Sequence, residues 1–260
     1  MAAAVPVPRG GPGAAGVGAL AADSGPPSVH AGSGALATAL SRVADEAALV
    51  LRPDGQGPAA PPELALRRLL AGNRRFLAGR PAHPRQGLRR VQEVSGGQTP
   101  MAMSLGCADS RVPPETLFDQ GIGDLFDQRV AGNVVDASVL GSIEYAAEHL
   151  HVPLLLVLGH GGCGAVAATV AAQRTGETPG GHVTSIVESI RPAVDPVLSR
   201  ATPDTPEEDL LQACVLANVA WVMGQIRTRS KIVAELESEG RLAVVGGFYD
   251  LASGAVSLLG

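Results

Sequence analysis

Hydrophobic positions recur with two different spacings along the chain from residue 62 onward. Six stretches carry apolar residues mostly three or four positions apart, which predicts helices, and short apolar runs between them predict buried strands. The predicted helices span 63–78, 137–150, 164–174, 182–198, 207–228 and, behind a Ser230 cap, 231–239. The predicted strands lie within 101–106, 125–131, 154–158, 241–249 and 255–259.

The order of these elements predicts the fold class. Strands that alternate with helices indicate an α/β fold with a mostly parallel central β-sheet flanked by helices. We expect the last run, 255–259, to be an antiparallel edge strand. Residues 152–172 carry no Asp, Glu, Lys or Arg over a length that would span a bilayer. Their centre reads Gly-His-Gly-Gly-Cys-Gly, which would expose backbone groups to lipid, so we expect a strand and a helix and no membrane span.

The first 61 residues differ in composition from the rest. They are mostly Ala, Gly, Pro and Val, and such a segment buries little apolar surface against a large ordering entropy. We predict a disordered tail and linker over 1–61 and one folded domain over 62–260. Arg9 stands alone and the apolar run 16–22 is too short for a secretory signal, so we expect a cytoplasmic protein. The alternative is an exported protein whose tail is a degenerate signal.

Composition excludes several classes of protein. The net charge is −5, and only seven residues are aromatic (one Trp, two Tyr, four Phe), which argues against nucleic acid as a partner. One arginine-rich stretch, 67–90, lacks interleaved aromatic residues apart from Phe76. We expect its side chains to be solvated or to pair with an acidic partner subunit. Three cysteines in a chain of this length indicate metal binding or catalysis rather than a disulfide scaffold.

The candidate chemistry follows two predicted strands. Cys107, Asp109 and Arg111 occur as Cys-Ala-Asp-Ser-Arg after the first strand, where extended backbone would place all three on one face. His160 and Cys163 follow a later strand, and Cys163 precedes a helix whose dipole would favour its thiolate. Two cysteines and one histidine resemble a catalytic zinc site with its fourth position open. The alternatives are a Cys107–Cys163 disulfide, or cysteines that serve only as small buried hydrophobes, as we expect for Cys214.

Two motifs in this order resemble the β-class carbonic anhydrases. They are Cys-Ala-Asp-Ser-Arg-Val-Pro-Pro-Glu at 107–115 and Gly-His-x-x-Cys-Gly at 159–164, whose histidine lies 53 positions after Cys107. Further similar segments are Gly-Asn-Arg-Arg-Phe at 72–76, Gln-x-Pro at 98–100, Gly-Asp-Leu-Phe at 123–126, Arg-Val-Ala-Gly-Asn at 129–133, Ser-Ile-Glu-Tyr at 142–145 and Gly-Gly-Phe-Tyr-Asp-Leu at 246–251. The resemblance covers residues 62–260.

The resemblance implies a zinc lyase that reversibly hydrates carbon dioxide to bicarbonate and a proton. Cys107, His160 and Cys163 would bind one Zn²⁺ per chain. Asp109 and Arg111 would form a catalytic dyad that orients a zinc-bound hydroxide, although in some members the aspartate itself occupies the fourth zinc position. The positions that match the family's substrate pocket are Gln98, Phe126, Ala131, Tyr145 and Gly164. Members self-associate as dimers or tetramers, so Tyr145 would line a pocket shared between subunits.

Two other functions fit the same residues. Related proteins of this fold hydrolyse carbon disulfide or carbonyl sulfide, and the sequence does not separate those substrates from carbon dioxide. A non-catalytic zinc-binding domain would result if Asp109 closed the fourth zinc position. We expect the carbonic anhydrase activity because the complete set of ligand and dyad residues is present.

Overall fold

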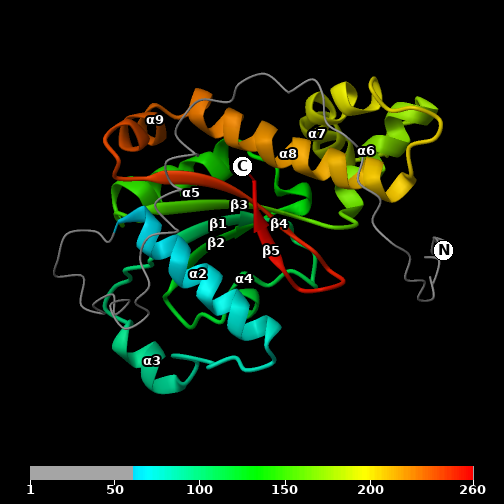
Figure 1. Ribbon diagram of the computed structural model, residues 1–260. Helices are drawn as coiled ribbons and strands as arrows, with labels where there is room; N and C mark the ends of the chain where they lie inside the picture. The colour runs from blue at the N-terminus through cyan, green and yellow to red at the C-terminus, as the bar shows by residue number, and fades with distance from the viewer. Residues whose placement is uncertain (1–60, 260) are drawn as a thin grey trace. The chain divides into compact units, whose positions relative to one another are not determined.

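The computed structural model describes residues 61–259 (Figure 1). Five strands form one sheet in the order β2-β1-β3-β4-β5. The strands are β1 (Ala102–Gly106), β2 (Leu125–Arg129), β3 (Leu154–His160), β4 (Ala243–Tyr249) and β5 (Val256–Leu258). Neighbours among the first four are parallel and β5 pairs antiparallel with β4, which confirms the predicted fold class. The predicted tail, apart from its last residue, lies outside the described residues.

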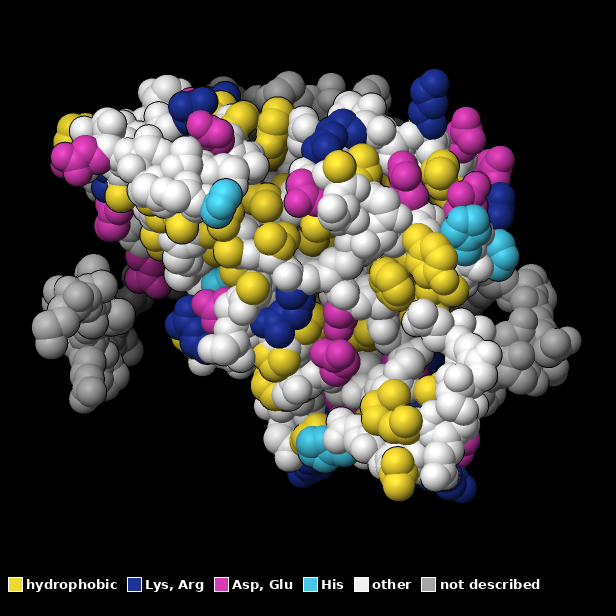
Figure 2. All heavy atoms as spheres, turned by 180° about the vertical axis from the view of Figure 1, so that it is seen from behind, with side chains coloured by type: hydrophobic (Ala, Val, Ile, Leu, Met, Phe, Trp, Pro, Cys, Tyr) yellow, Lys and Arg dark blue, Asp and Glu magenta, His cyan; other side chains and the backbone are white. Residues whose placement is uncertain are grey.

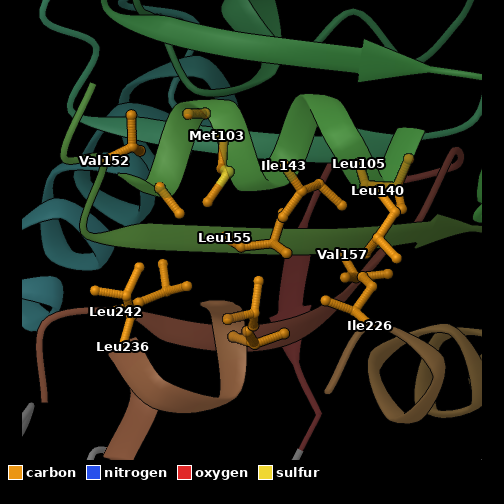
Figure 3. Close-up of a cluster of buried hydrophobic side chains, with 14 of the residues drawn as sticks. Met103, Leu105, Leu140, Ile143, Val152, Leu155, Val157, Ile226, Leu236 and Leu242 are labelled. Atoms are coloured by element: carbon orange, nitrogen blue, oxygen red, sulfur yellow. The ribbon is translucent and has the colours of Figure 1, made fainter. Parts of the chain in front are cut away.

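Helices cover both faces of this sheet (Figure 1). On one face, α2 and α4 pack against Leu154, Leu156 and Leu158 of β3. On the other face, α5, α8 and α9 pack against Leu155 and Val157 of the same strand (Figure 3). The described helices are α2 (Pro62–Leu77), α3 (Leu88–Glu93), α4 (Pro114–Leu117), α5 (Ala137–Glu148), α6 (Gly164–Thr175), α7 (Val183–Leu198), α8 (Glu207–Arg229) and α9 (Lys231–Ser238). β3 is therefore buried on both sides, as a continuous apolar run predicts.

Every predicted strand and helix is present, with ends that differ by a few residues. Ser230 caps α9 as predicted, since its side chain accepts a hydrogen bond from the Val233 N–H. The sequence analysis did not predict α3, α4 or the 3-10 turn η2 (Ala131–Asn133). These segments are one or two turns long, too short for a hydrophobic period to appear, and α3 buries no residue.

Helix α8 is the one described helix that is long and apolar enough to cross a membrane by length and composition. One face of α8 packs on the sheet and on neighbouring helices, through Val215, Val219 and Val222 among others. Packing against the sheet accounts for its apolar content. The uncharged stretch 152–172 divides into β3, a glycine turn and α6, as predicted.

The arginine-rich stretch pairs with acids of the same chain. Arg75 Nε lies 2.6 Å from Asp119 Oδ2, and an Arg85 guanidinium nitrogen lies 2.5 Å from Asp124 Oδ2. Both aspartates are buried. The prediction that these arginines are solvated or pair with an acidic partner subunit was therefore incomplete. The two ion pairs hold residues 119–124 against α2 and the segment that follows α2.

Helix α2 approaches the chain around α4 very closely at Gly72. A Cβ built on Gly72 would lie 1.7 Å from the Phe118 carbonyl oxygen, which is a backbone atom that has no room to move. The next residue, Asn73, donates hydrogen bonds to the Leu117 and Gly254 carbonyl oxygens. The absence of a side chain at position 72 therefore permits the contact that anchors α2.

We expect Gly72→Ala to destabilise the protein by about 1–3 kcal/mol or more, because a side chain forced into a close backbone contact costs that much. The matched control is Gly141→Ala in α5, where an added Cβ meets nothing within 4 Å. Glycine inside a helix is less favourable than alanine by about 1 kcal/mol, so this control is expected to stabilise. Thermal unfolding of both variants checks the pair, and equal shifts would contradict the close contact.

Candidate metal centre and active site

The parallel sheet brings the three predicted metal ligands to one edge. Cys107 directly follows β1, His160 ends the neighbouring strand β3, and Cys163 is the N-cap of α6. Because β1 and β3 run parallel, their carboxyl ends meet at the same edge. The two sulfurs and a ring nitrogen of His160 all lie within 4.8 Å of one another, and the three residues are buried. Both cysteines are free thiols, so the alternative of a Cys107–Cys163 disulfide is wrong.

His160 is oriented as a metal ligand would be. Its Nδ1 lies 2.9 Å from the Gly161 carbonyl oxygen, which fixes Nδ1 as the protonated nitrogen. Its Nε2 is buried and has no hydrogen-bond partner among the described residues. A buried nitrogen lone pair without a partner costs free energy, and a metal ion would satisfy it. This orphaned atom beside two thiols fits a divalent metal.

The two thiols form a coupled pair. A hydrogen bond from Cys163 lowers the pKa of Cys107 to about 4, against the effect of burial, and the Gly132 N–H contributes to the decrease. The same contact and burial raise the pKa of Cys163, and they outweigh the Val166 and Ala165 N–H groups at the helix terminus. The helix N–H groups thus favour the Cys163 thiolate in the predicted direction, but in the absence of a cation burial and Cys107 outweigh them. A Zn²⁺ ion between the sulfurs would allow both to ionise.

Asp109 and Arg111 form a close ion pair at the rim of this cluster. Arg111 donates from Nε to Asp109 Oδ1 at 2.9 Å and from a terminal nitrogen to Oδ2 at 2.7 Å. The backbone turns here instead of staying extended, because the Arg111 N–H also donates to Asp109 Oδ1. Asp109 Oδ2 lies 3.9 Å from His160 Nε2. Hydrogen bonds from Arg111 hold the pKa of Asp109 far below its usual range, so this carboxylate is ionised.

Three hydrogen bonds from Arg129 and Gly132, which the sequence did not predict, hold this loop in place. Arg129, at the end of β2, donates to the carbonyl oxygens of Cys107 (3.1 Å from Nε) and Asp109. The Gly132 N–H donates to Cys107 Sγ at 3.3 Å. Parallel pairing of β1 with β2 places Gly106 opposite Arg129, which brings Arg129 to the loop. The Arg-Val-Ala-Gly-Asn segment at 129–133 resembles the family in sequence, but its contacts with the loop depend on the register between β1 and β2.

The predicted pocket residues separate into two groups. Ala131 precedes Gly132 and Gly164 follows Cys163, so both adjoin the ligand cluster. Phe126 and Tyr145 contact each other, with ring centroids 6.3 Å apart. Phe126 lies opposite Met103 in the sheet. Met103 is four positions before Cys107, so Phe126 is displaced along the strand direction by roughly 13 Å from the level of Cys107. Gln98 is exposed in the loop before β1.

A half-buried carboxylic acid, Asp127, lies where β2 pairs with β1. The Ser104 hydroxyl donates to Asp127 Oδ1, and Asp127 Oδ2 is buried with no hydrogen-bond partner among the described residues. Burial raises the pKa of Asp127 to about 7, against the Ser104 hydrogen bond, and the Glu115 carboxylate adds to the increase. Between about pH 4 and about pH 7, Asp127 therefore keeps its proton in the folded protein. In the unfolded chain the same side chain has a pKa of about 3.9 and is ionised in this range.

We expect Asp127 to make the folded state less stable as the pH rises from about 4 to about 7. The folded protein binds more protons than the unfolded chain in this window, so stability is lost at about 1.4 kcal/mol per pKa unit. Asp127→Asn is neutral at every pH and removes this dependence. The melting temperature should therefore decrease more between about pH 5 and about pH 8 for the parent protein than for the variant. Parallel pH profiles would contradict the raised pKa.

The sequence matches the carbonic anhydrase family model over residues 102–256. Carbonic anhydrase 2 of Mycobacterium tuberculosis is 45% identical over 201 residues, covering 77% of this chain and 94% of that protein. The carbonic anhydrase of Mycolicibacterium smegmatis is also 45% identical over 201 residues, covering 77% and 95%. A carbonic anhydrase of Pseudomonas aeruginosa is 32% identical over 200 residues, covering 75% and 87%.

Solved structures give the same result for the fold. The Coccomyxa β-carbonic anhydrase in complex with acetazolamide superposes with a TM-score of 0.60 at 29% identity, covering 75% of this chain and 86% of that one. A tetrameric β-carbonic anhydrase of Sordaria macrospora superposes with a TM-score of 0.61 at 26% identity, covering 75% and 96%. With its Cys-His-Cys cluster at the edge of a mixed sheet, the chain belongs to the β-carbonic anhydrase family.

Proposed function

We propose that this carbonic anhydrase is a zinc enzyme that reversibly hydrates carbon dioxide to bicarbonate, with Asp109 and Arg111 as its catalytic dyad. The observation that carries the proposal is the cluster of Cys107, His160 and Cys163 with an ionised carboxylate at its rim. Two thiolates and one neutral imidazole balance the charge of Zn²⁺ and are ligands typical of zinc.

The dyad supplies orientation. Bound Zn²⁺ would make a water molecule a nucleophile near neutral pH, although two thiolate ligands make a weaker Lewis acid than three histidines. With the ion held by Cys107, His160 and Cys163, the ionised Asp109 carboxylate would accept a hydrogen bond from the nucleophile and so orient it toward carbon dioxide. Arg111 binds both oxygens of Asp109 and so holds the carboxylate away from the metal. This favours an open fourth position over a closed, non-catalytic zinc site.

The substrate pocket requires a second copy of the chain. Ala131 and Gly164 adjoin the ligand cluster of their own chain, whereas Phe126 lies near the start of β2, at the end remote from Cys107, and contacts Tyr145 of α5. Tyr145 is 47% exposed, although it is one of the few large aromatic side chains. We therefore place Gln98, Phe126 and Tyr145 in the pocket of a partner subunit. The small residues Ala131 and Gly164 and the apolar ring of Phe126 suit a small apolar substrate.

Self-association as a dimer or tetramer follows from this placement. Hydrophobic side chains gather in groups on the face that Figure 2 shows. The large exposed hydrophobic residues are Leu77, Leu88, Val91, Ile122, Tyr145 and Val183. Where exposed apolar side chains gather into contiguous patches, they are typical of an interface. Sedimentation equilibrium at micromolar concentration tests the assembly, and a monomer would exclude a shared pocket.

Metal content and activity together test the proposed chemistry. The purified protein should hold about one Zn²⁺ per chain and accelerate carbon dioxide hydration, with the rate increasing with pH as the nucleophile forms. Parallel assays with carbon disulfide and carbonyl sulfide decide between substrates. Cobalt substitution provides a third readout, since a spectrum that changes with pH shows an exchangeable water. A metal-loaded protein that hydrates none of these substrates would refute the proposal.

A further inference from the structure

Asn218 is a polar residue on the buried face of α8. Its side chain is 1% exposed, and its neighbours along that face include Val215, Val219 and Val222. Burying an amide among apolar side chains costs free energy unless it is hydrogen-bonded. The chemistry described so far does not use this residue, so its position requires another reason.

The one described hydrogen bond of Asn218 leads to the metal site. Its Nδ2 donates to the Gly132 carbonyl oxygen at 2.9 Å, across 86 positions of sequence. Its Oδ1 is buried and has no partner within residues 61–259. Among these residues, the amide is therefore anchored through its contact with Gly132.

Gly132 in turn holds Cys107. Its N–H donates to Cys107 Sγ, and its φ of +70° is a conformation that favours glycine. A Cβ at this position would lie 2.6 Å from Ile190 Cδ1 and 2.9 Å from Ala165 Cβ, so α6 and α7 enclose the turn. Gly132 therefore accepts a hydrogen bond from Asn218 through its carbonyl oxygen and donates one to Cys107 Sγ through its N–H.

Helix α8 also lies directly against the strand that carries His160. A Cβ at Gly159 would approach Val219 Cγ2 within 2.7 Å and Val215 Cγ1 within 2.8 Å. α8 therefore packs without a gap against the residue that precedes His160. A rigid helix in contact with both ligand segments is a suitable support for a side chain that must be placed precisely.

We propose that Asn218 is a positioning residue for the metal ligand Cys107 and acts through the peptide units of Gly132. The hydrogen bond fixes the turn η2, and the turn aims the Gly132 N–H at the sulfur. Such outer contacts orient a ligand and tune how much charge it donates to a metal. The inference rests on the zinc site proposed above and adds a residue to it.

Asn218→Leu tests the proposal because leucine has a similar volume and cannot donate a hydrogen bond. We expect metal affinity, measured by competition with a chromophoric chelator, to fall by about 10–100-fold. In the cobalt-substituted protein we expect the sulfur-to-metal charge-transfer band to shift, because Cys107 loses a well-aligned N–H donor. Asn218→Ser, which leaves a smaller polar side chain, should produce the same two changes.

The matched control is Val222→Ala, which removes buried volume one turn further along α8. It should lower thermal stability and leave metal affinity and the cobalt band unchanged. If both Asn218 variants bind metal and absorb light as the parent does, the positioning role is refuted while the zinc site stands. A parent protein that binds no zinc would refute the proposed function itself.

Discussion

Replacing Cys163 by serine is expected to remove metal and activity together. Cys163 is fully buried at the start of α6, and its sulfur is one of only three donor atoms in the cluster. A serine hydroxyl does not ionise near neutral pH, so it leaves the ion with one thiolate and one imidazole. Loss of a hydrogen-bond partner of a ligand costs about 10–100-fold in affinity, and loss of the ligand itself should cost more than that.

The measurement is zinc per chain after dialysis, together with the rate of carbon dioxide hydration. Cys214→Ser is the matched control, because Cys214 is an equally buried free thiol that takes no part in the cluster. It should lose stability and keep both zinc and activity. A Cys163→Ser protein with one zinc per chain and the parent's rate would show that the cluster is not the catalytic metal site.

Long elements of this fold could be predicted because each repeats its signal over several residues. β3 is a run of apolar residues bounded by Pro153 and by the glycines after His160, and the helical period of α5 extends over three turns. The same reasoning fails for α4, which has four residues, and for η2, which has three. Their conformations depend on prolines and on a left-handed glycine rather than on periodicity.

The cluster of candidate metal ligands could also be predicted, because strand ends in an α/β sheet converge wherever the strands are parallel neighbours. Cys107 and His160 each lie at such an end. Asp109 and Arg111 lie beside them, as their position after β1 predicts, but not on the extended backbone that the spacing suggests. In the structure a side chain-to-backbone turn joins the two residues, which a local spacing rule does not distinguish from a strand.

The supporting contacts were beyond sequence reasoning. Arg129 reaches the loop because β2 pairs with β1 in one particular register. Asn218 reaches Gly132 only through the packing of α8 over the sheet. One signal was available for Asn218, since a lone amide in an apolar helical stripe requires a partner, but the sequence does not indicate which partner. Every residue has a backbone carbonyl oxygen, so the residue types along the chain do not reveal which carbonyl accepts the hydrogen bond.

Asp109→Asn is expected to slow catalysis while the metal stays bound. Asparagine keeps the shape of the side chain but removes the anionic acceptor and weakens the pair with Arg111. A nucleophile that is no longer held in line with its target loses on the order of 100-fold in rate. We therefore expect kcat/KM to fall by about that factor with zinc still near one per chain. This combination separates a defect of orientation from the loss of metal in Cys163→Ser.

Arg111→Ala is expected to lower activity by releasing Asp109 from its ion pair. It frees the Asp109 carboxylate, which lies 3.9 Å from His160 Nε2 and would then be able to bind the ion itself. Activity should fall although the Asp109 carboxylate is present, and in the cobalt protein the pH-dependent change of the spectrum should disappear as the fourth position closes. An Arg111→Ala enzyme with full activity and an unchanged cobalt titration would mean that the pair with Arg111 does not hold Asp109 off the metal.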